Sequence, residues 1–172
     1  FNGGIIMSIH FHDSTAIHTA TGLGANAGDI LQTTSISRLT SNVSTSSNGS
    51  YQDSGLSVSI TPSATSSKVI IIAVLDFEGL GDRDRRLMTS LHAGNVQSST
   101  QIVRQNGGQY RTGGDNSMSH GSHTIWYMDS PNSTAQLTYK IGIMSLDGST
   151  VKILGGSGTN TRTYMYAQEV KG

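Results

Sequence analysis

Apolar and polar residues alternate along much of the chain from about residue 29 onward, and this period of two predicts β-strands. In Leu56–Ile60 the apolar side chains occupy every second position with serines between them, and Leu137–Ile143 repeats the pattern. Such strands are typical of antiparallel sheets with one buried and one wet face. Val69–Leu75 is instead continuously apolar and rich in β-branched residues, so we expect it at the centre of the core.

Turn residues separate further candidate strands at short spacing. Asn106-Gly107-Gly108 and Asp147-Gly148 both predict turns, and the second is the clearest tight hairpin because apolar stretches flank it on both sides. No helical period is visible, so the sequence predicts an all-β sandwich or barrel of about nine strands. The additional strands are expected at Asp29–Ile36, Arg86–Ala93, Thr100–Gln105, His123–Asp129, Thr150–Leu154 and Arg162–Val170.

The first 28 residues differ from the rest of the chain. They hold three of the six histidines and end in the Gly/Ala-rich stretch Gly22–Gly28, which is typical of a linker. We therefore expect an N-terminal extended arm over residues 1–28 and one β domain over residues 29–172.

Composition narrows the function classes. The 172 residues carry 11 basic and 11 acidic side chains, so the net charge of zero offers no electrostatic footprint for nucleic acid or an anionic membrane. Cysteine is absent, which excludes disulfides, thiolate catalysis and cysteine-based zinc sites. The longest apolar run, Val69–Leu75, is far shorter than the roughly 20 residues of a membrane span. We expect neither a nucleic-acid partner nor membrane insertion.

Four ordered segments carry a family resemblance. Gly28–Gln32, Gly55–Val69, Tyr127–Thr134 and Thr163–Val170 together resemble stretches of tail-fibre and other virion-surface proteins of tailed bacteriophages. Turn chemistry alone explains part of the pattern, because the two prolines lie where strands end and proline offers no ladder donor. The resemblance spans about residues 28–171.

The resemblance implies a jelly-roll-like antiparallel β-sandwich that serves as a virion structural module rather than as an enzyme. Members of the family usually assemble as trimers, so the implied partners are copies of the chain, other virion proteins bound through the arm, and a host surface glycan. A fibre or receptor-binding module on the particle surface is the first expectation. The alternatives are a capsid decoration (cement) protein and a carbohydrate-binding lectin domain outside any virus.

The arm contains a candidate metal site. His10 and His12 are separated by one residue, so on an extended chain both imidazoles lie on the same side. One chain supplies only two ligands, but three chains on a threefold axis would supply six nitrogens suited to a transition metal such as Fe, Ni or Zn. Phage fibres use this motif in that way. The alternative is an exposed polar strand or a pair of histidines at a subunit contact.

Charged residues gather in one stretch of the domain. The carboxylates Asp76, Glu78, Asp82 and Asp84 cluster there with Arg83, Arg85 and Arg86 among them. Arginine is suited to bidentate pairs across an interface. We expect a loop between strands whose charges pair with each other or with a neighbouring subunit. Two carboxylates facing a cleft would instead suit glycoside hydrolysis.

The aromatic residues give the last candidates. Trp126 and Tyr127 are adjacent, so only one of them can point into the core of a strand-based fold. Trp126, Tyr164 and Tyr166 are expected in the core or at a subunit contact, with sugar stacking as the alternative. His120-Gly121-Ser122-His123 is expected to be a surface loop.

Overall fold

The computed structural model describes residues 9–10, 16–17, 25–80, 85–99, 101–110, 118–146, 148–156 and 163–172. At 9–10, 16–17, 79–80, 85–86, 104–110 and 118–120 it describes the course of the backbone only. Every regular element of the described chain is a β-strand, and none of its residues form a helix long and apolar enough to cross a membrane. The all-β prediction is confirmed.

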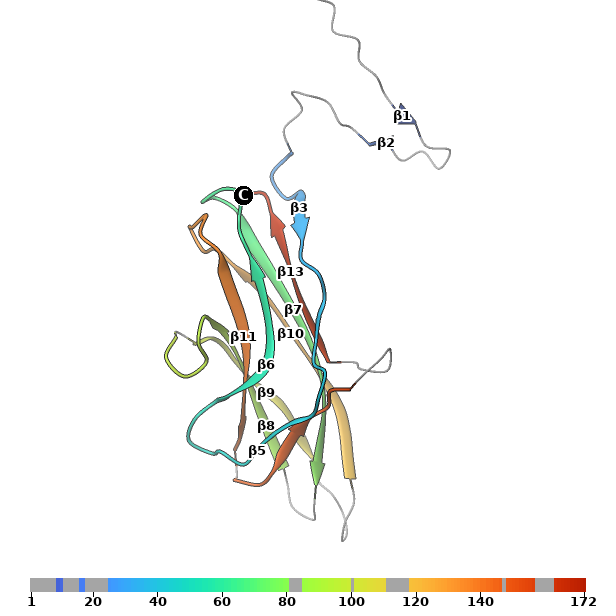
Figure 1. Ribbon diagram of the computed structural model, residues 1–172, viewed down its shortest axis with the longest axis vertical. Helices are drawn as coiled ribbons and strands as arrows, with labels where there is room; N and C mark the ends of the chain where they lie inside the picture. Colours follow the sequence, from blue (N-terminus) through green and yellow to red (C-terminus); the bar gives the residue numbers. More distant parts are fainter. Residues whose placement is uncertain are drawn as a thin grey trace, which may run out of the picture.

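Two antiparallel sheets pack face to face as a jelly-roll-like sandwich (Figure 1). The larger sheet has seven strands, arranged around the long β7. Its strands are β3 (Ile30–Thr33), β4 (Ser37–Arg38), β5 (Val43–Thr45), β7 (Lys68–Leu80), β10 (Met118–Asp129), β12 (Val151–Ile153) and β13 (Tyr164–Val170). The smaller sheet has the order β6-β11-β8-β9, with β6 (Gln52–Ile60), β11 (Leu137–Ser145), β8 (Arg85–Ala93) and β9 (Gln101–Tyr110).

Strand β7 is the centre of the larger sheet. One of its edges pairs with β10 along Val69–Leu80, while the other pairs first with β13 and then with β12. Its odd-numbered residues from Val69 to Phe77 are buried in the core. Its even-numbered residues Ile70, Ile72 and Val74 are only half-buried, so the continuous apolar stretch marks the central strand but not one that is covered on both faces.

Side-chain alternation sets the core. In β6 the residues Ser54, Leu56, Val58 and Ile60 are buried, while every second residue between them is more exposed. In β11 Tyr139, Ile141 and Ile143 belong to the same core cluster, and all residues from Ile141 to Ser145 are buried. Burying one face of each sheet against the other provides the main driving force for folding.

Three local predictions are wrong. Asn106-Gly107-Gly108 does not form a turn but lies within β9, and His120–His123 is not a loop but part of β10. The stretch around Asp147-Gly148 does not close a hairpin, because β11 and β12 belong to different sheets. In each case the conformation is set by pairing with a strand that is distant in the sequence: β9 pairs with β8, β10 pairs with β7, and β12 pairs with β5 and β7. The local glycine content carries no information about those distant partners.

The segment before β3 is tied to the end of the chain. Gly28 N donates to Lys171 O at 2.8 Å, Lys171 N donates to Asp29 O at 2.9 Å, and Lys171 Nζ donates to Ala25 O. The arm therefore leaves the sandwich beside the C-terminus, as Figure 1 shows. Within the described residues of the arm, β1 (Ile9–His10) pairs only with β2 (Ala16–Ile17).

Candidate functional site

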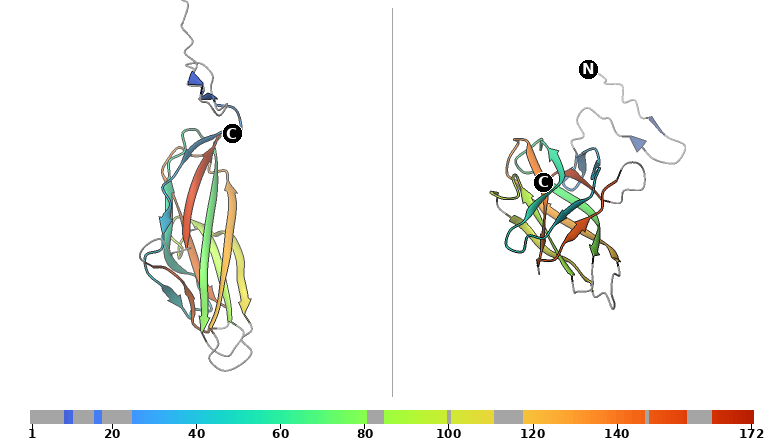
Figure 2. Two further views of the ribbon diagram at one scale, coloured as in Figure 1. Left: turned by 90° about the vertical axis from the view of Figure 1, so that its right-hand side faces the viewer. Right: turned by 60° about the horizontal axis from the view of Figure 1, so that its bottom comes forward.

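The outer surface of the larger sheet is a largely apolar face over β13, β7 and β10, which run side by side in the left view of Figure 2. Alternation places the core-facing residues of these strands on one side and this second set on the other. We call this surface the open face. Its residues are Ile70, Ile72, Val74, Thr124, Trp126, Met128, Tyr164, Tyr166 and Gln168.

Trp126 lies in the middle row of the open face. Ile72 is the cross-strand partner of both Trp126 on β10 and Tyr166 on β13, so the three side chains stand in one line across the sheet. Trp126 is 55% exposed and Met128 is 42% exposed. Neighbouring strands thus present contiguous large apolar side chains to solvent, which is typical of an interaction surface.

Charge is confined to the margin of the open face. The guanidinium carbon of Arg38 lies 6.0 Å from the centre of the Tyr164 ring, at the edge formed by β4. Further along the sheet, Lys152 Nζ and the buried Glu78 carboxylate form an ion pair at 3.0 Å. A neutral centre with paired or edge charges favours contact with an equally neutral surface, because little charge must be desolvated.

Beneath the open face, a buried carboxylate holds one end of the sandwich together. Glu169 on β13 is fully buried and points to the core side of the sheet. Its Oε1 accepts hydrogen bonds from Ser63 N at 2.6 Å, Ser63 Oγ at 2.7 Å and Ser67 Oγ at 2.7 Å, and its Oε2 accepts one from Gln32 Nε2 at 2.6 Å. We call Glu169, Ser63, Ser67 and Gln32 the carboxylate clamp.

The clamp keeps its carboxyl group ionised. Burial by itself raises the pKa of Glu169, but the hydrogen bonds from Ser67, Gln32 and Ser63 together outweigh burial and lower the pKa to about 2. The group is a fully satisfied acceptor with no exposed oxygen. Its arrangement therefore suits fastening the 61–67 turn to β3 and β13 rather than acid–base chemistry.

Three of the four segments that resemble phage surface proteins meet at this clamp, because Gln32, the Ser63–Ser67 turn and Glu169 come from different segments. The fourth segment lies at the same end of β7. Lys68 Nζ donates to Ser130 Oγ at 2.8 Å, and the Tyr139 hydroxyl donates to Asp129 Oδ2 at 2.7 Å. The four segments are thus held together by hydrogen bonds at one end of the sandwich.

The structure brings only some of the predicted site residues together. Trp126, Tyr164 and Tyr166 share the open face. Arg85 and Arg86 begin β8, which belongs to the other sheet, and Arg83 lies outside the described residues. His10 is in β1, where only the backbone is described, and His12 lies outside the described residues.

Potential metal ligands do not cluster in the described residues, where no group of three or more His, Cys, Asp or Glu side chains comes together. Sequence reasoning did not find the clamp or the apolar residues of β7 and β10 beside Trp126. A signal for the clamp exists: alternation through Met165, Ala167 and Glu169 places an acid on an otherwise apolar face.

Comparison with known proteins finds structural matches but no sequence match. Neither a protein-family model nor a curated protein matches the sequence. Among solved structures, the Eiger TNF of S. frugiperda matches 77% of this chain and 94% of its own, with 8% identity and a TM-score of 0.37.

Two structures from infectious bursal disease virus also match. The Gx strain covers 96% of this chain with 11% identity and a TM-score of 0.38, and the VP2 subviral particle covers 95% with 13% identity and a TM-score of 0.35. This chain spans 42% of the length of each viral chain. Matches at these scores do not identify a family or a function.

Proposed function

We propose that this chain is a non-enzymatic structural module of the surface of a phage-like particle, and that it assembles with copies of itself through the open face. The row formed by the exposed Trp126 and the half-buried Ile72 and Tyr166 carries the proposal. The resemblance of the four segments to phage surface proteins supports the setting, and the clamp gives three of these segments a purely structural task.

Assembly would bury the open face between subunits. Trp and Tyr are enriched in the centres of interfaces, where they supply large rigid contact areas. The hydroxyl of Thr124 and the amide of Gln168 at the ends of the face offer hydrogen bonds across the contact without charge desolvation. In this role the chain is a subunit of a fibre or receptor-binding module, most naturally a trimer as in the family that it resembles.

Native mass over a range of concentrations tests the proposal. We expect an oligomer for the parent chain and a monomer for Trp126→Thr. The matched control Thr124→Ser leaves Trp126, Ile72 and Tyr166 unchanged and should remain an oligomer. A parent chain that stays monomeric up to millimolar subunit concentration would contradict the proposal. Metal content measured on the same sample tests the proposed transition-metal site of His10 and His12 on a trimer axis.

The capsid-decoration alternative differs in what the arm binds. A decoration protein would use residues 1–28 to bind the shell, so purified particles lacking this protein should recruit the full chain. A fibre module would show no such binding to the bare shell.

Sugar binding is the second candidate function, because an indole that is 55% exposed on the open face can stack on a sugar ring. Glycan-array binding by the parent chain that disappears in Trp126→Thr would favour a host-glycan or lectin role. Oligomerisation without any glycan binding would favour the purely structural role.

A further inference from the structure

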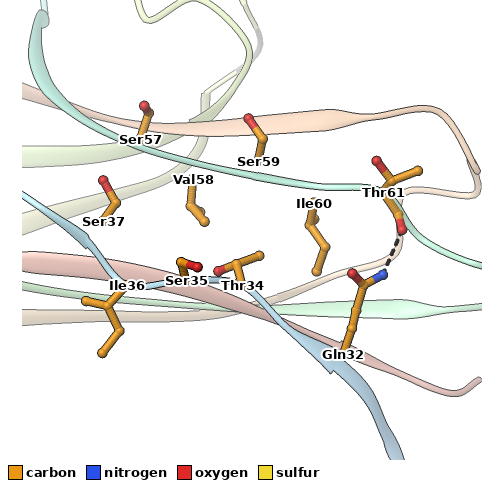
Figure 3. Close-up of a pocket in the computed structure, with 10 residues that line it drawn as sticks. All are labelled: Gln32, Thr34, Ser35, Ile36, Ser37, Ser57, Val58, Ser59, Ile60 and Thr61. Atoms are coloured by element: carbon orange, nitrogen blue, oxygen red, sulfur yellow. Dashed lines mark hydrogen bonds between the residues drawn. The ribbon is translucent and has the colours of Figure 1, made fainter.

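A shallow groove of about 530 Å³ runs along the side of the sandwich, between β6 and the segment that joins β3 to β4 (Figure 3). We call it the edge groove. Val58 and Ile60 of β6 point toward the opposite segment and are buried, whereas Ser57 and Ser59 point away from it. Ile36 of the opposite segment is 52% exposed and points away from β6. Gln32 closes one end by donating from Nε2 to Thr61 O at 2.7 Å. No residue that lines the groove carries a charge.

Strand β6 presents an unused hydrogen-bonding edge to this groove. It is the outermost strand of its sheet, and no other described strand pairs with its free edge. Thr138 O accepts a hydrogen bond from Gly94 N on the β8 side of β11, so the backbone groups of Thr138 face β8 and not β6. Ser59 is the partner of Thr138 in the β6–β11 register.

The alternation of backbone groups then fixes which residues face outward. In an antiparallel pair, a residue whose partner turns its backbone groups away is in a non-hydrogen-bonded pair. The N–H and C=O groups of Ser59, and of Ser57 two residues earlier, therefore point to the free edge and into the groove. Thr61, two residues after Ser59, should likewise point its C=O group to the free edge, and its carbonyl oxygen does accept a hydrogen bond there from Gln32 Nε2.

The arm carries a sequence that matches such an edge. Met7, Ile9 and Phe11 alternate with Ser8, His10 and His12, so an extended arm would have one apolar and one polar face. Ile9 and His10 are already in a strand, β1, whose only partner among the described residues is the two-residue β2. An isolated two-stranded ribbon of this length does not bury an apolar face.

We propose that the arm of a second copy of this chain, through residues 5–11, adds as an extra strand to the free edge of β6. As the next strand of the sheet, its apolar side chains would extend the core-facing row of Val58 and Ile60, which are themselves buried, and Ser8 and His10 would extend the exposed row of Ser57 and Ser59. Residues 5–11 carry no charged side chain apart from His10, so the match is one of backbone pairing and apolar contact. This inference rests on the proposed self-assembly but uses a different surface from the open face.

The position of the arm makes exchange geometrically direct. The arm leaves the sandwich at Ala25–Asp29, bound to Lys171, and Gln32 at the end of the edge groove follows only three residues after Asp29. In the proposed trimer each arm could therefore add to the next copy around the threefold axis, and such a head-to-tail exchange closes into a ring after three copies.

Cysteine crosslinking tests the exchange on the full chain, which contains no native cysteine. A Ser8→Cys chain with a mass tag is mixed with an untagged Ser59→Cys chain, and interchain disulfide formation is followed under mild oxidation. The matched control replaces Ser59→Cys by Ser122→Cys, an equally exposed serine on the edge strand of the other sheet. We expect the Ser59 pair to crosslink at least about tenfold faster, because docking raises the local concentration of the arm thiol.

The outcomes separate the proposals. Equal crosslinking at Ser59 and Ser122 would overturn arm exchange. Fast disulfide formation within a single Ser8→Cys/Ser59→Cys chain at high dilution would overturn it as well, since the chain's own arm would then fill the groove. An Ile9→Asp change in the arm should abolish the fast crosslink. Trp126→Thr tests the open face. An oligomer that persists in Trp126→Thr would contradict only the contact through that face, whereas equal crosslinking at Ser59 and Ser122 in a parent chain that is oligomeric would contradict only arm exchange.

Discussion

The outer surfaces of the two sheets differ in whether other side chains of the same chain cover them. On the smaller sheet, Tyr51 and Val96 lie over Gly142, which has no room for a side chain: a Cβ atom there would be 2.8 Å from Val96 Cγ1 and 3.1 Å from Tyr51 Cβ. His92 is buried beside them, with Nε2 2.8 Å from Ser90 Oγ and its ring 6.0 Å from that of Tyr51. We call this the covered face.

On the larger sheet, the row of Trp126, Ile72 and Tyr166 has no comparable cover among the described residues. The covered face is built from small and polar residues and is closed by a short turn, residues 94–99, of the same chain. The open face carries the larger apolar side chains. The contrast supports the proposal that the open face contacts another copy of the chain, because contiguous exposed apolar area is typical of interaction surfaces.

The largest effect is expected beneath the open face, at the carboxylate clamp. Glu169→Gln replaces an acceptor oxygen by a donor against Ser63, Ser67 or Gln32, so the unfolding free energy should fall by about 3 kcal/mol in urea titrations. Gln168→Glu, the neighbour that points to the open face, is the control and should change stability by about 0.5 kcal/mol or less. Equal stability of Glu169→Gln and the parent would contradict the clamp.

The same residue predicts an acid limit. The folded-state pKa of Glu169 is lowered from 4.5 to about 2, so its stabilising contribution is complete above pH 4.5 and is lost as the pH falls toward 2. Unfolding curves of the parent and of Glu169→Gln should therefore converge in that window. A constant difference between the two proteins down to pH 2 would argue against an ionised clamp.

A comparable substitution on each surface measures how tightly the surface is covered. Gly142→Leu on the covered face should cost about 2 kcal/mol or more, because the cover must shift to admit the side chain. Thr124→Leu on the open face should change the stability of the chain by about 0.5 kcal/mol or less. Similar losses in thermal and urea unfolding for both variants would erase the distinction between the faces.

Removing one apolar side chain from each surface should separate stability from assembly. Trp126→Thr should alter the unfolding free energy by about 1 kcal/mol or less, since the indole is mostly exposed, while shifting the native mass to the monomer. Val96→Thr should lower stability by about 1 kcal/mol and leave the native mass unchanged. The opposite assignment would mean that the covered face is the one that meets a partner.

The smallest effect is a pH dependence that the covered face contributes. Burial lowers the pKa of His92 from its ordinary 6.5, against opposing effects of the Ser99 backbone and the Asp53 charge. The unfolded chain therefore binds a proton more readily than the folded chain, and stability should decline as the pH falls through 6.5. Burial also lowers the pKa of His123, so His92→Gln should flatten part of this decline and His92→Gln/His123→Gln more of it.

Local patterning anticipates much of the fold. The alternation in Leu56–Ile60 corresponds to one buried side of β6, and the apolar run at Val69 marks the central strand. The alternation in Leu137–Ile143 predicts one exposed side of β11, but residues 141–145 are buried on both sides. Pairing between distant strands is not contained in such patterns. The extension of β10 back to Met118 depends on its ladder with β7, and the separation of β11 from β12 depends on which sheet each strand joins.

The site is less accessible to sequence reasoning. The sequence does not show which of the neighbours Trp126 and Tyr127 points into the core. In the structure Tyr127 packs against the core and Trp126 is exposed. The clamp requires knowing that residues 32, 63, 67 and 169 meet in space. The edge groove likewise lies between strand β6 and the segment that joins β3 to β4, so no single stretch of residues predicts it.

The ladder between Gly28, Asp29 and Lys171 has a practical consequence for topology. Since residues 25 and 171 are already hydrogen-bonded neighbours, a short peptide could join Gly172 to that segment without disturbing either strand. A circularly permuted chain, reopened at an exposed turn such as the one around Asn48-Gly49, should then keep the sandwich while detaching the arm from it. In such a permuted protein the new chain ends would lie at the turn around Asn48-Gly49, and the row of Trp126, Ile72 and Tyr166 would be unchanged.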